Sequence, residues 1–142
     1  MVIVRFNVFV RSVPYDPPSG VCKAGNRPGV VALRNVIRRA LRSVSDGGIY
    51  NCRETAMGSP SEHAEGRAWD AGIRKNDQAT GNALANWLVK HARELKIQSV
   101  IWNRKVWGFG GASWGDYCTD SSPCAPKGKR NPHTGLRFEL RT

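Results

Sequence analysis

The chain lacks any apolar stretch long enough to cross a membrane. A spanning helix needs about 18 to 20 consecutive apolar residues, and each apolar run in these 142 residues is much shorter. Residues 1–10 also lack the basic start and the small-residue cleavage site of a secretory signal. Their alternating apolar side chains predict a β-strand instead. We therefore expect neither a membrane span nor a signal peptide.

Acidic residues are scarce. The chain has 11 Asp and Glu against 22 Lys and Arg, a formal net charge of +11. Such a positive field attracts polyanions, either nucleic acid or the anionic polymers of a bacterial wall. The sequence also lacks zinc-finger spacing, an RNP sequence, a clear helix-turn-helix and a phosphate-cradling glycine loop. We therefore expect a cell-wall partner first and nucleic acid second.

Cysteines are few, and none form a C-x-x-C pair. The four are Cys22, Cys52, Cys118 and Cys124, which allow three connectivities. The most local one joins Cys118 to Cys124 and Cys22 to Cys52. Disulfides would indicate an oxidising compartment, whereas four reduced thiols in a cytosolic protein are the alternative.

The length suits one domain, residues 1–142, that buries about two-thirds of its unfolded surface. It begins with the strand and an irregular segment rich in proline and glycine, which together span residues 1–29. Apolar residues recur at helical spacing in two later stretches, and short apolar runs between turn residues predict strands. The predicted helices are 30–44 and 78–95, and the predicted strands are 49–53, 68–73, 99–103 and two near Lys105 and Leu136. The predicted fold is α+β, with both principal helices on one side of a mainly antiparallel sheet and the site on the other.

One motif carries the chemistry. His63 and Asp70 lie seven residues apart, and Gly66 between them allows the chain to turn back. Imidazole and carboxylate are ordinary zinc ligands, and a catalytic zinc takes three protein ligands and an open position for water. The alternative is a loop histidine held by a strand carboxylate, which would only stabilise a turn.

The pattern Ser61-x-His63-x-x-Gly66-x-Ala68-x-Asp70 resembles the signature of D-Ala-D-Ala carboxypeptidases and VanY-like zinc peptidases, the M15 family, which cut peptidoglycan stem peptides. Two later segments, 100–107 and 131–135, resemble the actinobacterial and phage branch of that family. The resemblance covers roughly residues 48–140. It implies the hedgehog-like zinc peptidase fold, one zinc ion and a wall peptide as substrate.

The resemblance also implies roles for particular residues. It makes His63 and Asp70 metal ligands and Arg53 an anchor for the substrate, and His133 is the candidate for the third ligand. For the general base we consider Glu139, which strand alternation places on the same face as Arg137, and Glu62 and Glu65 in the first motif. The remaining candidates for substrate contact are Ser61, Trp107, Trp114 and Arg137.

Trp102 and His91 are expected in or beside the core rather than at the site. Trp102 lies in a predicted strand and is expected in the core, whereas Trp107 and Trp114 flank a glycine-rich loop that could wall a groove. His91 follows the apolar spacing of the second helix, so we expect it at the edge of the core, packed on the sheet.

The sequence departs from the family in its last strand. Arg137 stands where the third zinc-ligating histidine of the family falls, and a guanidinium has no lone pair to offer. Either His133 reaches the metal, or Arg137 pairs with Asp70 and excludes zinc.

Three functions follow. The first is a zinc-dependent peptidoglycan peptidase, the second a catalytically degenerate relative that binds an anionic wall polymer or another partner, and the third a basic nucleic-acid-binding protein. For the first two we expect an extracellular location, on the cell wall or on a phage particle.

Overall fold

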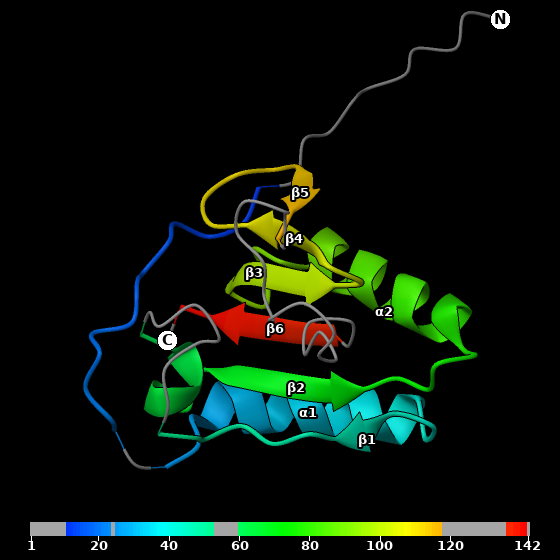
Figure 1. Cartoon of the computed structure of the whole chain (residues 1–142), viewed down its shortest axis with the longest axis horizontal. Coiled ribbons are helices and arrows are strands. Elements are labelled where there is room, and N and C mark those ends of the chain that lie inside the picture. Colours follow the sequence, from blue (N-terminus) through cyan, green and yellow to red (C-terminus); the bar gives the residue numbers. More distant parts are fainter. Residues whose placement is uncertain (1–10, 24, 53–59, 118–135, 142) are drawn as a thin grey trace, which may run out of the picture.

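A computed structural model describes residues 11–23, 25–52, 60–117 and 136–141 of the chain. Its described strands form one antiparallel sheet of six strands in the order β1-β2-β6-β3-β4-β5 (Figure 1). The elements are α1 (Pro28–Ala40), β1 (Ser45–Asp46), the 3₁₀ helix η1 (Glu62–Glu65), β2 (Ala68–Gly72), α2 (Gln78–Lys90), β3 (Ile97–Trp102), β4 (Lys105–Gly108), β5 (Trp114–Asp116) and β6 (Leu136–Leu140). The α+β class with two principal helices is confirmed.

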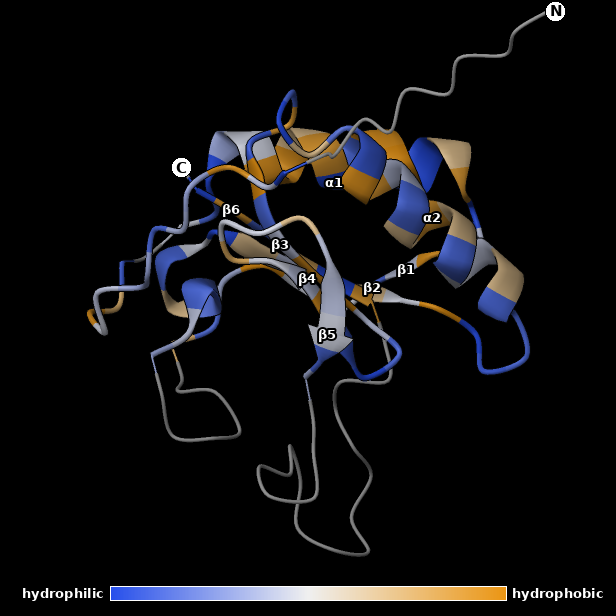
Figure 2. Ribbon diagram, turned by 90° about the horizontal axis from the view of Figure 1, so that it is seen from above, coloured by the Kyte–Doolittle hydropathy of each residue, from blue (hydrophilic) through white to orange (hydrophobic). Residues whose placement is uncertain are grey.

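Both α-helices cover the same face of the sheet (Figure 2). α1 begins with Pro28, a residue pre-organised for the first helical turn. α2 begins after Asp77, whose carboxylate accepts a hydrogen bond from the backbone N–H of Thr80 at 3.2 Å. The buried residues of the helices and the sheet form one hydrophobic core, in which the rings of Trp69 and Phe138 pack edge to face at 5.6 Å.

β6 lies at the centre of the sheet, between β2 and β3, and separates the core from the site. Leu136, Phe138 and Leu140 belong to the hydrophobic core beneath the helices. Side chains alternate along a strand, so Arg137 and Glu139 point to the opposite face. Both are nevertheless buried, with 5% and 2% of their surface exposed. The site is therefore built on the sheet face that the α-helices leave open.

Some predicted boundaries were wrong. α1 ends at Ala40 rather than at residue 44, because Leu41 and Val44 reach the core from a turn that continues the apolar spacing of the helix. α2 likewise ends at Lys90 rather than at residue 95. The predicted strand at 49–53 is irregular over its described part, 49–52, and its apolar signal comes from buried Ile49.

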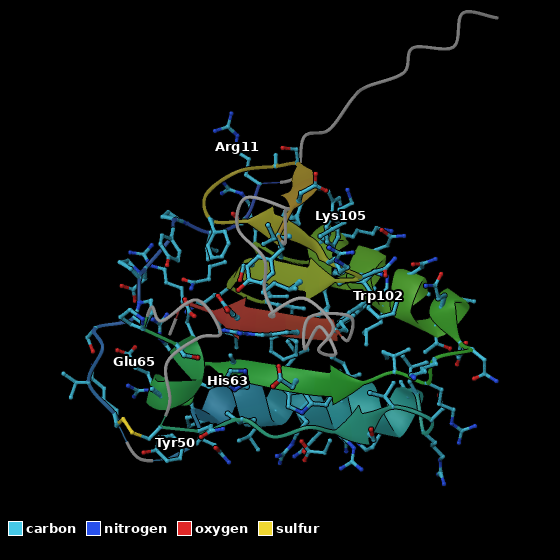
Figure 3. All side chains as sticks on the ribbon, viewed as in Figure 1. Arg11, Tyr50, His63, Glu65, Trp102 and Lys105 are labelled. Carbon is cyan, nitrogen blue, oxygen red and sulfur yellow. A yellow bond between two sulfur atoms is a disulfide. The ribbon has the colours of Figure 1, made fainter. Side chains whose placement is uncertain are left out.

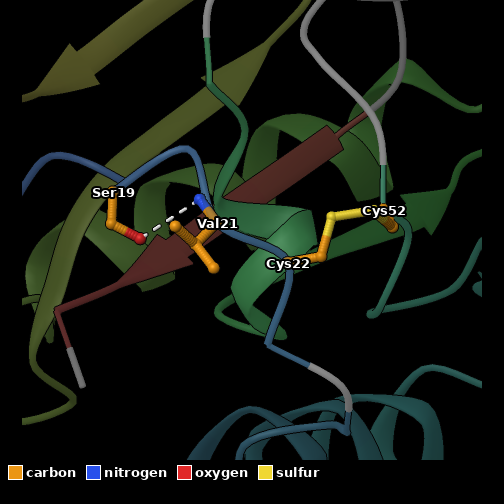
Figure 4. The surroundings of a disulfide bond; sticks show 4 residues. All are labelled: Ser19, Val21, Cys22 and Cys52. Atoms are coloured by element: carbon orange, nitrogen blue, oxygen red, sulfur yellow. Dashed lines mark hydrogen bonds between the residues drawn. A yellow bond between two sulfur atoms is a disulfide. The ribbon is translucent and has the colours of Figure 1, made fainter.

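The predicted disulfide between Cys22 and Cys52 is confirmed, with a Cα–Cα distance of 5.5 Å (Figure 4). It ties the segment before α1 to the irregular segment before η1. A disulfide indicates an oxidising compartment. The predicted strand at residues 1–10 and the pairing of Cys118 with Cys124 lie outside the described residues. None of the described helices is long and apolar enough to span a bilayer.

Candidate functional site

The structure brings His63 and Asp70 together, with His63 Nε2 3.2 Å from Asp70 Oδ1. Ser61 starts η1, because its hydroxyl accepts a hydrogen bond from the backbone N–H of His63. Gly66 ends η1 with a φ of +68°, and a Cβ there would lie 2.1 Å from the carbonyl oxygen of Gly25. Only glycine fits this turn, which leads the chain into β2 and places Asp70 beside the ring.

The backbone carbonyl of Ile49 fixes the orientation of the His63 ring. His63 Nδ1 lies 2.6 Å from this oxygen, and a carbonyl can only accept, so we assign a hydrogen to Nδ1. Nε2 therefore faces Asp70, either as a lone pair or with a second proton. A backbone carbonyl behind the ring is a common partner of a metal-ligating histidine. His63 is 2% exposed, whereas the side chain of Asp70 is 40% exposed, so solvent reaches the pair from the Asp70 side.

An ion cluster lies on the same sheet face, centred on Arg137. Arg137 Nη2 donates to a carboxylate oxygen of Glu139 and lies 3.4 Å from Glu62 Oε2. The Ser99 hydroxyl donates to Glu139 at 2.8 Å, and the Gln98 amide donates to Glu62 at 3.3 Å. Arg137, Glu62 and Glu139 are each at most 5% exposed. One buried cation thus serves two buried carboxyl groups.

The electrostatics of the cluster follow from this burial. Burial raises the pKa of Glu62, and the neighbouring Glu139 raises it further, so that it reaches about 8 although Arg137 opposes the shift. Burial alone would lower the pKa of Arg137, but the carboxylates of Glu139, Asp70 and Glu62 outweigh it and raise that pKa. Near pH 7 Glu62 holds a proton and Arg137 stays charged. Because Asp70 acts on Arg137, the ion cluster and the His63–Asp70 pair form one site.

The residues described do not complete a catalytic zinc site. In the register of β2 with β6, Arg137 stands directly opposite Asp70, the place where the resemblance puts the third ligand. No group of three or more His, Cys, Asp or Glu residues that could hold a metal occurs in the described ranges. His63 and Asp70 supply two donors, whereas a catalytic zinc requires three. His133 and Arg53 lie outside the described residues, so their roles stay predictions.

Comparison with known proteins defines the family. A family model described as "VldE, C-terminal domain" matches residues 22–126, most of the chain. The chain belongs to this family. A solved structure titled "Structure of the LdcB LD-carboxypeptidase reveals the molecular basis of peptidoglycan recognition" is similar to it with a TM-score of 0.43 and 22% identity, over 80% of this chain and 75% of that chain. A search of curated proteins finds no match.

In this VldE-family domain, Glu65 has structural partners (Figure 3). Its carboxylate accepts hydrogen bonds from the backbone and hydroxyl of Ser19, at 2.9 and 2.6 Å, and from Arg67 Nε at 2.8 Å. Burial would raise the pKa of Glu65, but these hydrogen bonds and the charge of Arg67 lower it to about 2. Its contacts tie the N-terminal segment to η1. The assignment of Glu65 as general base stays a prediction, as does that of Glu139, whose oxygens meet Arg137 and Ser99.

The predicted tryptophan wall is not assembled at the site. Trp107 pairs with Val100 on the core face of the sheet and is 1% exposed. Trp114 pairs with Trp107, so it shares that face and lies at the sheet edge, 38% exposed. Directly paired residues point the same way, and Arg137 points the other way. The positions of these two rings therefore indicate a packing role rather than a wall of a binding groove.

Trp102 is in the core, as predicted, and its indole N–H donates to Asn82 at 2.7 Å. His91 differs from the prediction: it lies at the end of α2 with its side chain 32% exposed, against the ring of Trp87 rather than on the sheet.

Sequence reasoning did not assign Gln98 and Ser99 to the site. Both reach it because the register shifts between Ile97 and Ser99 where β3 pairs with β6. No pattern in the sequence marks this irregularity. Glu62, in contrast, was considered as a general base from the sequence, since it lies next to His63 inside the motif.

Proposed function

We propose that this domain binds peptide stems of bacterial peptidoglycan and does not hydrolyse them with zinc. The observation that carries the proposal is the place of Arg137, opposite Asp70 and held by Glu62 and Glu139. The peptide ligand itself rests on the resemblance of the motif around His63 to wall peptidases.

The charge balance supports this choice. A zinc ion next to Asp70 would lie close to the guanidinium of Arg137, and two like charges repel strongly where water is excluded. The guanidinium instead satisfies the carboxylates that a metal would otherwise neutralise. Arg137 thus stabilises the open sheet face without a metal.

A ligand would find a donor in the same place. Arg137 Nε is buried and has no hydrogen-bond partner within the described part of the chain. A buried donor without an acceptor costs about 1–3 kcal/mol. We expect a carbonyl or carboxylate of the bound peptide to accept from it after a small movement of the side chain, with Asp70 at the exposed side of the site.

The second candidate is a zinc peptidase in which His133 is the third ligand. It is favoured by the contact between Ile49 and His63, which aims Nε2 toward Asp70 as in a metal site. When bound by His63, Asp70 and His133, zinc would polarise the scissile carbonyl and lower the pKa of its water to about 7. Ser61 would keep His63 in place, and Arg53 would hold the substrate.

Both candidates agree with an extracellular location on the cell wall or on a phage particle. The disulfide between Cys22 and Cys52 supports an oxidising compartment. The positive charge of the chain supports an anionic environment such as a bacterial wall.

The test measures binding and cleavage in one sample. The oxidised protein is titrated with a soluble muropeptide by calorimetry, without and with zinc, and the products are analysed by mass spectrometry. We expect binding that does not need zinc and no cleavage product. Asp70→Asn should weaken binding at least about tenfold, whereas the exposed control Glu94→Gln should not weaken it. Zinc-dependent product formation would establish the second candidate instead. A complete lack of binding in either condition would contradict the proposal.

A further inference from the structure

β1 forms the edge of the sheet beside β2 (Figure 1). A groove lined by arginines lies at this edge, away from the candidate site. Two cavities of about 510 and 440 Å³ adjoin there, because both are lined by Arg38, Arg42 and Val44. Arg39 lines the first cavity and Arg74 lines the second. We call this surface the arginine groove. One wall is the end of α1 with the turn after it. The other wall is the end of β2 with the residues directly after it in the chain.

The described residues leave most of the positive charge of the groove without an acidic partner. Asp46, the nearby acid, pairs with Arg34 at 3.3 Å and accepts from the indole of Trp69. Arg38 donates to the backbone carbonyl of Val44 at 3.5 Å. The other three arginines, at positions 39, 42 and 74, form no ion pair within the described ranges. These three arginines thus line the hollow without a carboxylate partner in the described part of the chain.

Guanidinium groups suit phosphate as a ligand, because their planar donors match two phosphate oxygens at once. Successive arginines along a groove suit a ligand whose negative charges repeat, and the two cavities form a continuous path for such a chain. A nucleic acid also has repeating phosphates, but proteins that bind single strands add aromatic side chains on which bases stack. The described lining of both cavities contains no aromatic residue.

We infer that the arginine groove binds a phosphodiester polymer of the bacterial wall, a chain of alditol phosphates without bases. The disulfide supports this source, since an oxidising compartment is where such polymers occur and where nucleic acid is uncommon. The inference goes beyond the proposed peptide function and does not depend on it, because the groove shares no lining residue with the Arg137 cluster. The groove would hold the domain on the wall while the sheet face meets peptide.

The test uses the full, oxidised chain and poly(glycerol phosphate), with single-stranded DNA of equal phosphate number as the comparison ligand. Affinity is measured by calorimetry at several salt concentrations for the wild type, for the groove variant Arg39→Ser with Arg42→Ser, and for the control Arg11→Ser with Arg93→Ser. Both variants lose two exposed arginines, so their net charges are equal. Circular dichroism and urea unfolding confirm that each variant is folded.

We expect the groove variant to bind the polymer at least about tenfold more weakly, with a shallower dependence of affinity on salt. The control should stay within about twofold of the wild type at 0.15 M salt, where distant exposed charges are screened. Equal losses in both variants would show that only net charge matters and would overturn the inference. So would a lack of polymer binding, or DNA binding as tight as that of the polymer.

Discussion

The buried carboxyl of Glu62 should make folding stability fall as pH rises. Its pKa is about 8 in the folded protein, against an ordinary value of 4.5. Between these values the folded chain holds a proton that the unfolded chain has released, so raising the pH favours unfolding. This contribution is complete below about pH 4.5 and is lost as pH rises through 8. Its slope is at most about 1.4 kcal/mol per pH unit.

The substitution Glu62→Gln removes this titration while it keeps the shape of the protonated side chain. The charged groups that face it, Arg137 and Glu139 on β6, remain, as does Tyr15. We expect the wild type to lose about 2.5 kcal/mol between pH 5.5 and 7.5 through this group, slightly less than the limiting slope gives, because part of the folded population has already released the proton at pH 7.5. The variant should match the wild type only below about pH 4.5, where the side chain is protonated in both states, and its advantage in stability should grow by a similar amount between pH 5.5 and 7.5.

Urea unfolding followed by tryptophan fluorescence, with the disulfide intact, measures the effect. Trp69 and Trp107 are buried, so unfolding changes their emission. The two proteins share every other side chain, so the contributions of the other groups cancel in the difference. Glu94→Gln is the matched control, because its side chain is 77% exposed, and its curve should run parallel to the wild type. Parallel curves for Glu62→Gln and the wild type would refute the argument.

Three further predictions concern stability. Glu65→Gln should cost about 1–2 kcal/mol at pH 7, and the difference should vanish toward pH 2, because a lowered pKa stabilises the fold only above it. Cys22→Ser with Cys52→Ser should cost about 3–4 kcal/mol in urea unfolding, since the disulfide spans 30 residues. Gly81→Ala should lower the thermal midpoint by the equivalent of about 1–3 kcal/mol, because its Cβ would lie 2.2 Å from the ring of Trp102.

Two of these predictions have a matched control, and the third has an outcome that would contradict it. The wild type with its disulfide reduced should resemble the double serine variant, and a large difference would point to an effect of serine itself. Gly115→Ala introduces the same methyl group where no atom lies within 4 Å, so it should be nearly neutral. An equal cost at both glycines would contradict the packing argument. A loss in Glu65→Gln that persists at pH 2 would contradict the assigned pKa.

Much of the fold follows from the sequence because buried apolar residues recur at a regular spacing in strands and helices. The alternation around Arg137 and Glu139 predicted a strand with both side chains on one face, and β6 has that arrangement. Helix ends were less predictable, since Leu41 and Val44 continue the apolar spacing of α1 from a turn. The strand predicted around Ile49 was wrong because an irregular segment can also bury an apolar side chain.

The site was predictable only where its residues are close in the chain. The spacing of His63, Gly66 and Asp70 was sufficient to place the pair together, because one glycine turn joins them. The ion cluster required tertiary information. Gln98 reaches Glu62 from β3, 36 residues away, through an irregularity that no local propensity encodes. The face of the sheet on which Trp107 lies also depends on strand register. The glycine-rich sequence beside Trp107 does not indicate that face.

The most direct test of the central claim, that Arg137 takes the place of the third zinc ligand, is the zinc content of three proteins after dialysis with a small excess of zinc. We expect the wild type and Arg137→Gln to retain almost none. Arg137→His offers an imidazole opposite Asp70 and beside His63, so it should retain about one zinc per chain. A wild type that retains about one zinc per chain would contradict the claim and point to His133 as the third ligand.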